Sequence, residues 1–282
     1  MEYAITAQNL SISFREKQIL KDITLNIQAG EIFGLLGPSG AGKTTLIKLL
    51  TGQLRQDSGF ARLLGTDTRK LCAREHRQIG TMMDTLGLYE RLSAYDNLSF
   101  YADIYHVPRR KIADILKDIG LYEARNTAVS KLSKGMKNRL SLARALINDA
   151  KILFLDEPTS GLDPVTVKEI HAILAKQKKQ GIALFLTTHN MFEAESLCDH
   201  IALLNEGHII EYGKPSEICQ KYNHLNRFQI TLKNGEVVSL KNSRDSVSQI
   251  NAYLEQEQIK TIHSTEPTLE TVFVELTGRG LN

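Results

Sequence analysis

The run Gly37-Pro-Ser-Gly-Ala-Gly42-Lys43-Thr44-Thr45 decides the fold of this chain. It matches the pattern GxxxxGK[ST], in which glycines let backbone N–H groups turn inward around phosphates and a lysine reaches the terminal phosphates. An alternating run, Glu31–Leu36, precedes it, and a helical run from Gly42 to about Leu50 follows it, so a helix N-terminus adds its positive dipole end. This strand–loop–helix context distinguishes the motif from a chance glycine-rich turn. The predicted phosphate-contacting residues are Gly37, Pro38, Ser39, Gly40, Ala41, Gly42, Lys43, Thr44 and Thr45.

A second motif is an apolar strand that ends in two acids. Ile152–Leu155 is followed directly by Asp156 and Glu157. Beside a phosphate loop, Asp156 and the Thr44 hydroxyl are predicted to hold Mg²⁺, and Glu157 to act as the general base that polarises the attacking water. A solvated strand end, or a helix cap leading into Pro158, is the structural alternative. The two motifs together predict an enzyme that hydrolyses a nucleoside triphosphate, with Mg²⁺ as its cofactor.

The wider pattern predicts a mixed α/β core with a helical insertion in its middle. Strand runs at Lys151–Leu155 and Ile182–Leu186, separated by the helix Val165–Lys179, form a βαβ pattern with parallel strands. Further strands are expected at Tyr3–Thr6, Leu10–Phe14, Ile23–Ile27 and Glu31–Leu36. Helices are expected from a Ser93–Asp96 capping box to before Pro108, from about Arg109 to Ile119, and from about Ser133 onward.

The pattern of expected helices and strands changes after Pro215. Arg227–Leu232 and Glu236–Leu240 flank Asn234-Gly235, a strong signal for a hairpin with a two-residue turn. A helix (about Ser246–Glu257), a short strand (about Ile259–His263) and a last helix (Leu269–Leu276) are expected to follow. We therefore expect a core domain over residues 1–220, with its helical subdomain at about 86–149, and a small C-terminal α+β domain over residues 221–282.

Composition narrows the possible partners. The 35 Lys+Arg against 32 Asp+Glu give a net charge of +3, less basic than a typical nucleic-acid-binding domain, so no nucleic acid is expected. The cysteines Cys72, Cys198 and Cys219 are far apart and form no CxxC, so reduced thiols are expected. The N-terminus does not resemble a secretory signal, and the apolar runs are too short to span a bilayer. Any membrane role is therefore expected to come from another subunit.

Further motifs, taken in order, identify a family. The phosphate loop precedes Leu132-Ser133-Lys134-Gly135-Met136, Leu155-Asp156-Glu157-Pro158-Thr159, Ser160-Gly161-Leu162-Asp163 and His189. Over about residues 3–215 this order resembles the nucleotide-binding subunit of an ABC transporter, because other phosphate-loop ATPases lack the LSxG stretch. The resemblance implies an α/β P-loop NTPase fold, with an ABC ATPase core built on a mixed sheet and an inserted helical subdomain. The small α+β appendage follows that core.

The resemblance also implies a dimer. In this family two domains sandwich two ATP molecules head to tail, so each site combines the phosphate loop of one copy with the signature of the other. Here Ser133 and Gly135 are implied to meet the ATP of a second copy, as a homodimer or with a paired nucleotide-binding subunit. Ser133 also opens a predicted helix, Lys134–Ile147, whose N-cap it provides, and capping is compatible with phosphate contact.

Three more residues receive roles from the resemblance. His189 is implied to contact the γ-phosphate and to hold the attacking water and Glu157 in register. Asp163 is implied to lie at the dimer interface, and Phe14 to stack on adenine. From the residues alone, a surface histidine, a helix cap and a core phenylalanine remain the alternatives for His189, Asp163 and Phe14.

The sequence departs from the family pattern at two places. Asp84, in the run Ile79–Asp84, stands where the family usually has glutamine. A carboxylate there is expected to join the Mg²⁺ shell directly or through water. Lys134 replaces a signature glycine and is expected to add a cation near the phosphates. Activity is expected to survive both changes.

These departures and the ending Pro267–Gly278 resemble the subgroup that serves type-2 ABC exporters, including subunits for bacteriocin or antibiotic export. The implied function is export of a peptide, antibiotic or lipid-like substrate through a separate transmembrane permease, with this subunit peripheral at the cytoplasmic face of the membrane. The permease is expected to dock near Leu88 and Tyr89. A non-transport ABC-type ATPase of translation or DNA repair is one alternative, although those carry two cassettes or long coiled-coil insertions. A nucleotide-binding regulator is the other, against which the intact catalytic residues argue.

Overall fold

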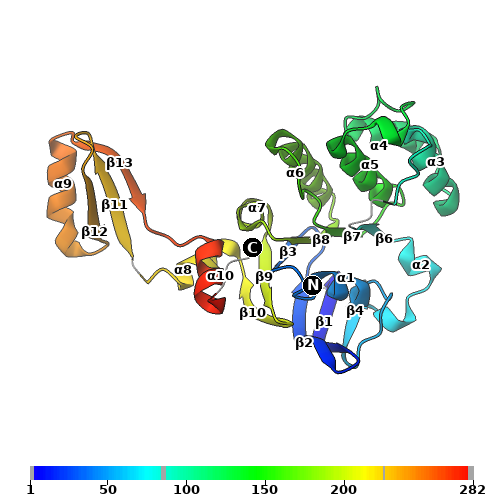
Figure 1. The fold of residues 1–282 in the computed structure, drawn as a ribbon, viewed down its shortest axis with the longest axis horizontal. Coiled ribbons are helices and arrows are strands. Elements are labelled where there is room, and N and C mark those ends of the chain that lie inside the picture. Colours follow the sequence, from blue (N-terminus) through cyan, green and yellow to red (C-terminus); the bar gives the residue numbers. More distant parts are fainter. Residues whose placement is uncertain (1–2, 84–86, 225, 279–282) are drawn as a thin grey trace. The chain divides into compact units, whose positions relative to one another are not determined.

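The computed structural model describes residues 3–83, 87–224 and 226–278. Their contacts divide the chain into two compact units, the first ending at Lys214 and the second beginning at Pro215 (Figure 1). Each unit has its own sheet structure and is described by itself.

A six-stranded mixed sheet forms the centre of the first unit. Its strands, in spatial order, are β10 (His208–Gly213), β9 (His200–Asn205), β3 (Ile32–Leu36), β8 (Ala183–Thr188), β7 (Ile152–Asp156) and β6 (Ile79–Met82). Neighbours pair in parallel, except that β10 runs antiparallel to β9. β3, β7 and β8 are buried along their whole length, as strands covered on both faces must be. The predicted βαβ unit is confirmed, because α6 (Pro164–Lys179) connects β7 to β8.

A smaller antiparallel sheet belongs to the same unit. Its order is β2 (Lys17–Ile27), β1 (Ile5–Phe14), β4 (Ser58–Leu63) and β5 (Thr66–Asp67). The prediction of two strands at Tyr3–Thr6 and Leu10–Phe14 is wrong, since β1 is continuous. Its register against β2 shifts between Ala7 and Leu10, where Asn9 has a φ of 50°. The sequence around this irregularity resembles a turn between two strands. In the structure it changes only the direction of one continuous strand.

Helices surround the large sheet and form the insertion. The helices of the first unit are α1 (Lys43–Leu50), α2 (Ala73–His76), α3 (Ala94–Tyr105), α4 (Arg110–Asp118), α5 (Lys134–Leu146), α6 and α7 (Met191–Leu197), with the 3₁₀ turns η1 (Thr68–Lys70) and η2 (Val129–Lys131). The expected capping of α3 is confirmed, because the Ser93 hydroxyl accepts a hydrogen bond from the Asp96 N–H at 3.0 Å. α3, α4 and α5 gather on one side of β6 and β7 (Figure 1), as the helical insertion predicts.

An apolar core joins the two sheets of the first unit to α1. At its centre the ring of Phe33 lies 5.4 Å from that of Phe185, which lies 5.5 Å from Phe154. All three rings are fully buried, and each contributes roughly 1.5–3 kcal/mol relative to an exposed side chain. They hold β3, β8 and β7 side by side, and this fixes the loops at the carboxyl ends of these strands.

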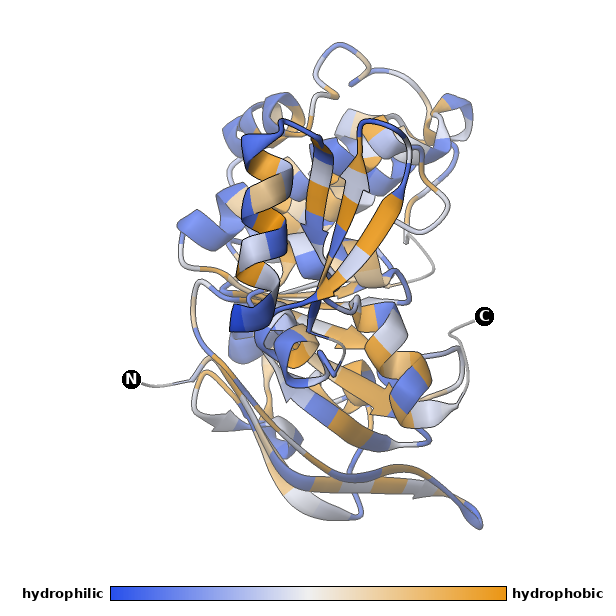
Figure 2. Cartoon of the chain, turned by 90° about the vertical axis from the view of Figure 1, so that its left-hand side faces the viewer, coloured by the Kyte–Doolittle hydropathy of each residue, from blue (hydrophilic) through white to orange (hydrophobic). Residues whose placement is uncertain are grey.

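The second unit is a small α+β structure. Its elements are α8 (Pro215–Lys221), β11 (Arg227–Leu232), β12 (Val237–Lys241), η3 (Arg244–Ser246), α9 (Val247–Glu255), β13 (Ile259–Ser264) and α10 (Leu269–Thr277). The sheet has the order β12-β11-β13, and hydrophobic and hydrophilic bands alternate along its strands (Figure 2). The hairpin is confirmed but its turn differs from the prediction. The Leu232 N–H donates to Glu236 O at 2.8 Å, and this bond encloses three residues that end in Gly235, whose φ is 90°.

None of the helices in the described ranges is both long enough and apolar enough to cross a membrane.

Candidate active site

The phosphate loop connects the carboxyl end of β3 to α1. A Cβ at Gly37 would lie 2.3 Å from the backbone oxygen of Leu204 on β9, so only glycine fits there. Gly42 has a φ of 112°, and a Cβ at this position would lie 2.6 Å from a methyl carbon of Leu20. These two glycines allow the loop to turn tightly against the sheet before the helix begins.

An open cleft of about 490 Å³ lies against this loop. The described residues that line it are Phe14, Ile19, Ser39, Gly40, Gly42, Lys43, Thr44, Thr45, Asp156, Glu157, Ser160 and His189. The other predicted loop residues, Gly37, Pro38 and Ala41, belong to the turn but do not line the cleft. The structure thus brings the two sequence motifs and His189 to one place.

Lys43 lies at the base of the cleft, where its side chain is largely buried. Its ammonium donates to Gly37 O at 2.6 Å and to Pro38 O at 3.3 Å. The same nitrogen lies 3.7 Å from Glu157 Oε1. A single cation therefore lies between the turning backbone of the loop and the predicted general base.

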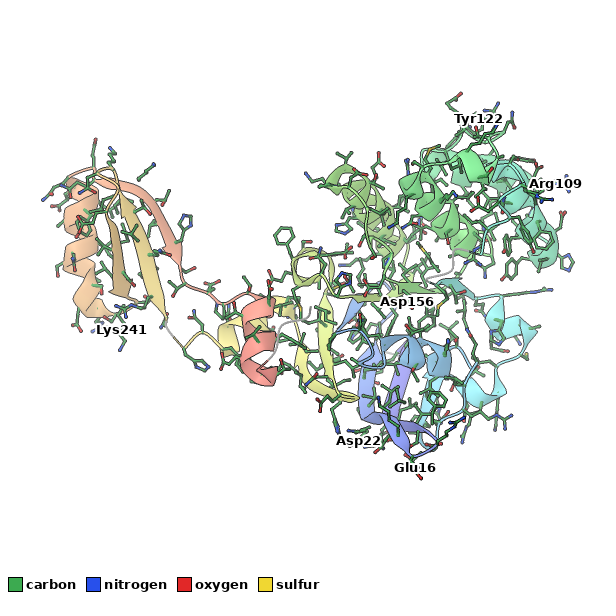
Figure 3. The ribbon with its side chains drawn as sticks, viewed as in Figure 1. Glu16, Asp22, Arg109, Tyr122, Asp156 and Lys241 are labelled. Carbon is green, nitrogen blue, oxygen red and sulfur yellow. The ribbon has the colours of Figure 1, made fainter. Side chains whose placement is uncertain are left out.

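Asp156 ends β7 directly beside the first turn of α1. Its side chain is buried, and its two oxygens accept from Thr44 Oγ1 at 2.9 Å and from Thr187 Oγ1 at 2.5 Å. Figure 3 labels Asp156 at the end of β7. The alternative of a solvated strand end is therefore wrong for Asp156. A buried carboxylate beside a hydroxyl is a donor set of hard oxygens, which suits Mg²⁺.

Glu157 and His189 form a pair above this carboxylate. Glu157 has a φ of 50°, in the left-handed region, and its N–H donates to Thr187 O at 3.2 Å. Its side-chain oxygen Oε2 lies 2.8 Å from His189 Nδ1. A non-glycine residue held in this conformation stores strain that the surrounding structure must impose. The turn directs the Glu157 carboxylate into the cleft, where the imidazole fixes its orientation.

Phe14 lies at the end of β1 and also lines the cleft. Its side chain is 46% exposed, so the alternative of a core phenylalanine is wrong. Ile19 and Ser160 line the cleft too, and sequence reasoning did not identify either as a site residue. Ser160 belongs to the motif Ser160–Asp163, so the sequence did contain a signal for it. Ile19 carries no such signal, because it reaches the cleft through the pairing of β2 with β1.

Ser133, Gly135 and Asp163 are not among the described residues that line the cleft. Ser133 caps α5, because its hydroxyl accepts from the Met136 N–H at 3.2 Å. A Cβ at Gly135 would lie 2.9 Å from the side chain of Thr166, so the small residue also serves the packing of α5 on α6.

Asp163 caps the neighbouring helix, α6. Its carboxylate accepts from the Val165 and Thr166 N–H groups at 3.1 and 3.0 Å. The Thr166 hydroxyl and N–H groups hold the pKa of Asp163 below its usual value. The alternative of a helix cap is thus correct for Asp163, and it leaves the carboxylate exposed at the surface.

Lys134 is exposed at the first position of α5. A Cβ at Gly161 would lie 2.4 Å from its ammonium nitrogen, so the lysine extends over the loop that precedes Asp163. Asp84, the other departure from the family pattern, lies outside the described residues, and its predicted part in the metal site remains a prediction. Within residues 3–83, 87–224 and 226–278, no cluster of three or more His, Cys, Asp or Glu side chains forms a metal site of its own.

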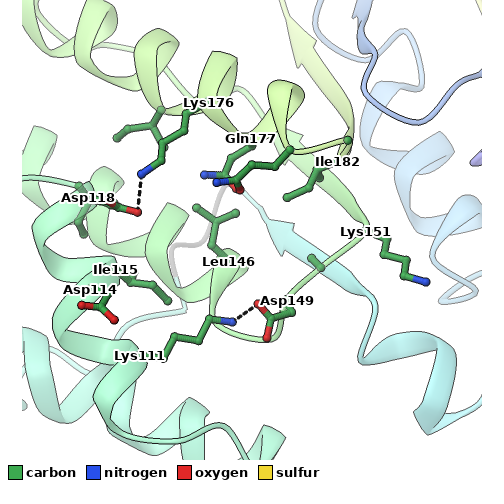
Figure 4. A pocket seen from close by; sticks show the side chains of 15 residues that line it. Lys111, Asp114, Ile115, Asp118, Leu146, Asp149, Lys151, Lys176, Gln177 and Ile182 are labelled. Atoms are coloured by element: carbon green, nitrogen blue, oxygen red, sulfur yellow. Dashed lines mark ion pairs between the residues drawn. The ribbon is translucent and has the colours of Figure 1, made fainter.

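A second cleft, of about 440 Å³, lies between α4, the end of α5 and α6 (Figure 4). Its ion pairs join Lys176 to Asp118 at 2.8 Å and Lys111 to Asp149. The cleft reaches the residues that precede β7 and β8, whereas Asp156 is the last residue of β7, at the opposite end of that strand. It is therefore separate from the nucleotide cleft, and two of the acids that line it, Asp118 and Asp149, are paired with lysines.

Comparison with known protein sequences identifies the family of this chain. Residues 20–160 match the family model described as ABC transporter. A fluoroquinolones export ATP-binding protein of Mycobacterium tuberculosis (strain CDC 1551 / Oshkosh) is 38% identical over 266 residues, which are 93% of this chain and 88% of that protein. A lantibiotic transport ATP-binding protein of Streptococcus pyogenes is 36% identical over 225 residues, which are 79% of this chain and 97% of that protein.

The fold agrees with the sequence match. A dimeric ATP-binding cassette in a post-hydrolysis state, bound to ADP and Pi, superposes with a TM-score of 0.67 at 26% identity, over 74% of this chain and 98% of that one. Together with the cleft that joins Lys43, Asp156 and Glu157, these likenesses identify the activity as hydrolysis of ATP. The chain belongs to the ABC transporter family, as an ATP-binding subunit whose ATPase activity is coupled to transport.

Proposed function

We propose that two copies of this chain, or this chain and a paired nucleotide-binding subunit, close head to tail over two ATP molecules. The observation that supports the proposal is that the motifs lie in two separate places on one chain. Lys43 and Glu157 line one cleft, whereas Ser133 caps α5 outside that cleft. A second copy supplies Ser133 and Gly135 to the open side of the cleft, where the hydroxyl and the N-terminus of α5 meet the γ-phosphate.

Each residue of the cleft has a role in this proposal. Lys43 binds the β- and γ-phosphates, and Phe14 stacks on the adenine ring. Glu157 accepts a proton from the water whose oxygen bonds to the γ-phosphorus, while the bond from that phosphorus to the bridging oxygen breaks and ADP leaves. His189 holds the Glu157 carboxylate through the 2.8 Å contact and donates to the γ-phosphate from its other ring nitrogen.

Thr44 and Asp156 are the residues that would hold Mg²⁺. The ion supplies positive charge at the β- and γ-phosphate oxygens when it is bound. Support comes from the 2.9 Å contact between the Thr44 hydroxyl and the buried carboxylate, because this contact places two hard-oxygen ligands at the start of α1. Asp84 is a further proposed ligand.

The proposed transport role is export through a separate transmembrane permease. Relatives named for fluoroquinolones export and lantibiotic transport support a substrate that is an antibiotic, a peptide or a lipid-like molecule. The permease would dock on the insertion and hold the chain at the cytoplasmic face of the membrane. Tyr89 and Phe100 support this position, since both rings are more than two-fifths exposed and lie 5.0 Å apart.

The proposed dimer is tested with Glu157→Gln. The amide is a far weaker base than the carboxylate, so the ATP-bound dimer is expected to accumulate because hydrolysis no longer opens it. Gel filtration with Mg-ATP should shift this variant to twice the monomer mass, while ADP leaves it monomeric. A monomeric profile with both nucleotides, in a variant that binds ATP, would contradict the head-to-tail site.

A further inference from the structure

A carboxylate outside the nucleotide cleft occupies an unusual position in the first unit. Glu193, on α7, is 2% exposed and accepts three side-chain hydrogen bonds. Thr159 Oγ1 lies 2.7 Å from Oε1, His171 Nε2 lies 2.8 Å from the same oxygen, and Thr188 Oγ1 lies 3.0 Å from Oε2. A buried acid is costly unless it is fully hydrogen-bonded, and here donors approach both oxygens.

The three donors come from segments that carry the reacting groups. Thr159 lies two residues after Glu157, in the turn that follows β7. Thr188 ends β8 and is followed directly by His189. The carboxylate of Glu193 thus bonds to both segments that provide the 2.8 Å contact between Glu157 and His189.

The network also bonds to the surrounding backbone. The Thr188 hydroxyl accepts from the Asn190 N–H at 3.0 Å, and Asn190 Oδ1 accepts from the Glu193 N–H at 3.1 Å. The turn around His189 is therefore closed by hydrogen bonds at both of its ends. His171 stands on α6, so the same carboxylate connects this turn to the helix that Asp163 caps.

We propose that Glu193 is a positioning residue for ATP hydrolysis, which holds the Glu157 turn and the His189 turn at the separation the reaction requires. Glu193 does not line the nucleotide cleft and touches no substrate. This inference rests on the proposed roles of Glu157 and His189. It predicts that loss of the network slows the chemical step without weakening the binding of ATP.

The first unit contains a matched control for this network. Glu31 is also buried, at 8% exposed, and its Oε1 lies 2.7 Å from His200 Nδ1. This pair joins the start of β3 to the start of β9, at the opposite end of these strands from the phosphate loop. It is a glutamate–histidine pair of the same kind without contact to the Glu157 or His189 turns.

The test measures kcat and KM for Mg-ATP in Glu193→Gln, Thr159→Val and Glu31→Gln. In Glu193→Gln the amide group presents one acceptor and two N–H groups to three donors, so the turns lose a bond. A displacement of a reacting group by a fraction of an ångström is expected to lower kcat about tenfold or more. KM is expected to change by less than about threefold, because the phosphate contacts are untouched.

The other variants make the result decisive. Thr159→Val removes a single hydroxyl at constant shape and is expected to lower kcat even if Glu193→Gln does not fold, whereas Thr159→Ser restores the hydroxyl and the rate. Glu31→Gln is expected to keep the wild-type kcat. Unchanged kcat in folded Glu193→Gln, a change in KM alone, or an equal loss in Glu31→Gln would overturn the proposal. Glu157→Gln is assayed alongside, so that loss of its turnover with a normal Glu193→Gln rate rejects this inference and leaves the proposed function standing.

Discussion

At the scale of single residues, the site depends on charges held very close together. The Lys43 ammonium lies 3.7 Å from Glu157 Oε1, and the other oxygen of that carboxylate contacts His189. A lysine that binds two backbone oxygens and faces a carboxylate cannot move away without losing all three partners. The position of the cation is therefore set before any phosphate enters, which is the property that electrostatic catalysis of phosphoryl transfer needs.

The protonation of Glu193 is expected to make the stability of the fold depend on pH. Burial alone would raise its pKa, but the hydrogen bonds from His171, Thr159 and Thr188 outweigh burial and hold the pKa below the usual value for glutamate. The stability that these bonds give is therefore fully present above the usual glutamate pKa and is lost as the pH falls through the lowered pKa. Hydrogen bonds to a charged group contribute about 1.5–3 kcal/mol.

The measurement is urea unfolding of the wild type and Glu193→Gln across a series of pH values. The wild type is expected to be more stable at neutral pH, and the difference is expected to shrink only in strongly acidic buffer. A difference that disappears at or above the usual glutamate pKa would show that burial, and not hydrogen bonding, controls this carboxylate.

At the scale of elements, the exposed face of the insertion is the expected docking surface for the permease. Phe100 on α3 and Tyr89 before it pack edge to face at the surface, and Leu92 and Ile104 are exposed as well. An aromatic anchor of this kind commonly carries more than 1 kcal/mol of an interface. Phe100→Ser is therefore expected to reduce recovery of a multi-span membrane partner from detergent extracts about tenfold.

Phe192→Ser provides the control, since Phe192 is 79% exposed on α7 and is no part of this face. It is expected to recover the partner as the wild type does. Equal recovery with both variants, at equal thermal stability, would exclude the insertion as the docking surface.

The phosphate loop, the acidic end of β7 and the helices of the insertion could all be predicted from the sequence. Lys43, Thr44, Asp156 and Glu157 are predictable because each lies at a fixed offset from a strand end, and parallel strands bring their carboxyl ends to one edge. The helices of the insertion are predictable from capping signals such as Ser93. The signals for these residues and helices lie in short stretches of sequence, so they can be recognised before the packed structure is known.

Other features need tertiary contacts that local patterns do not contain. The exposure of Phe14 depends on the register of β1, which shifts near Asn9. The burial of Glu193 depends on α6 and on two turns that are distant in the sequence. In the sequence Glu193 is one of two acids in a short amphipathic stretch, and nothing there indicates that it is enclosed. Such residues are found only when the packed structure is known.

At the scale of the whole molecule, the proposed mechanism depends on a site divided between two copies. One copy provides Lys43, Asp156 and Glu157 in a cleft that remains open on one side. Ser133 caps the start of α5 and is exposed at the surface of the insertion. A closed C2 dimer that exchanges these surfaces completes two sites at once, as isologous interfaces require.

Mixing two inactive variants tests this claim most directly. Lys43→Ala disables the phosphate loop, and Ser133→Asp keeps a good N-cap for α5 while placing a negative charge against the γ-phosphate. Each variant alone is expected to hydrolyse ATP at a negligible rate. In an equimolar mixture about half of the dimers are mixed, and each of these has one intact site of two, so about one quarter of the wild-type rate should return. A mixture no more active than the average of its two parents would contradict the divided site.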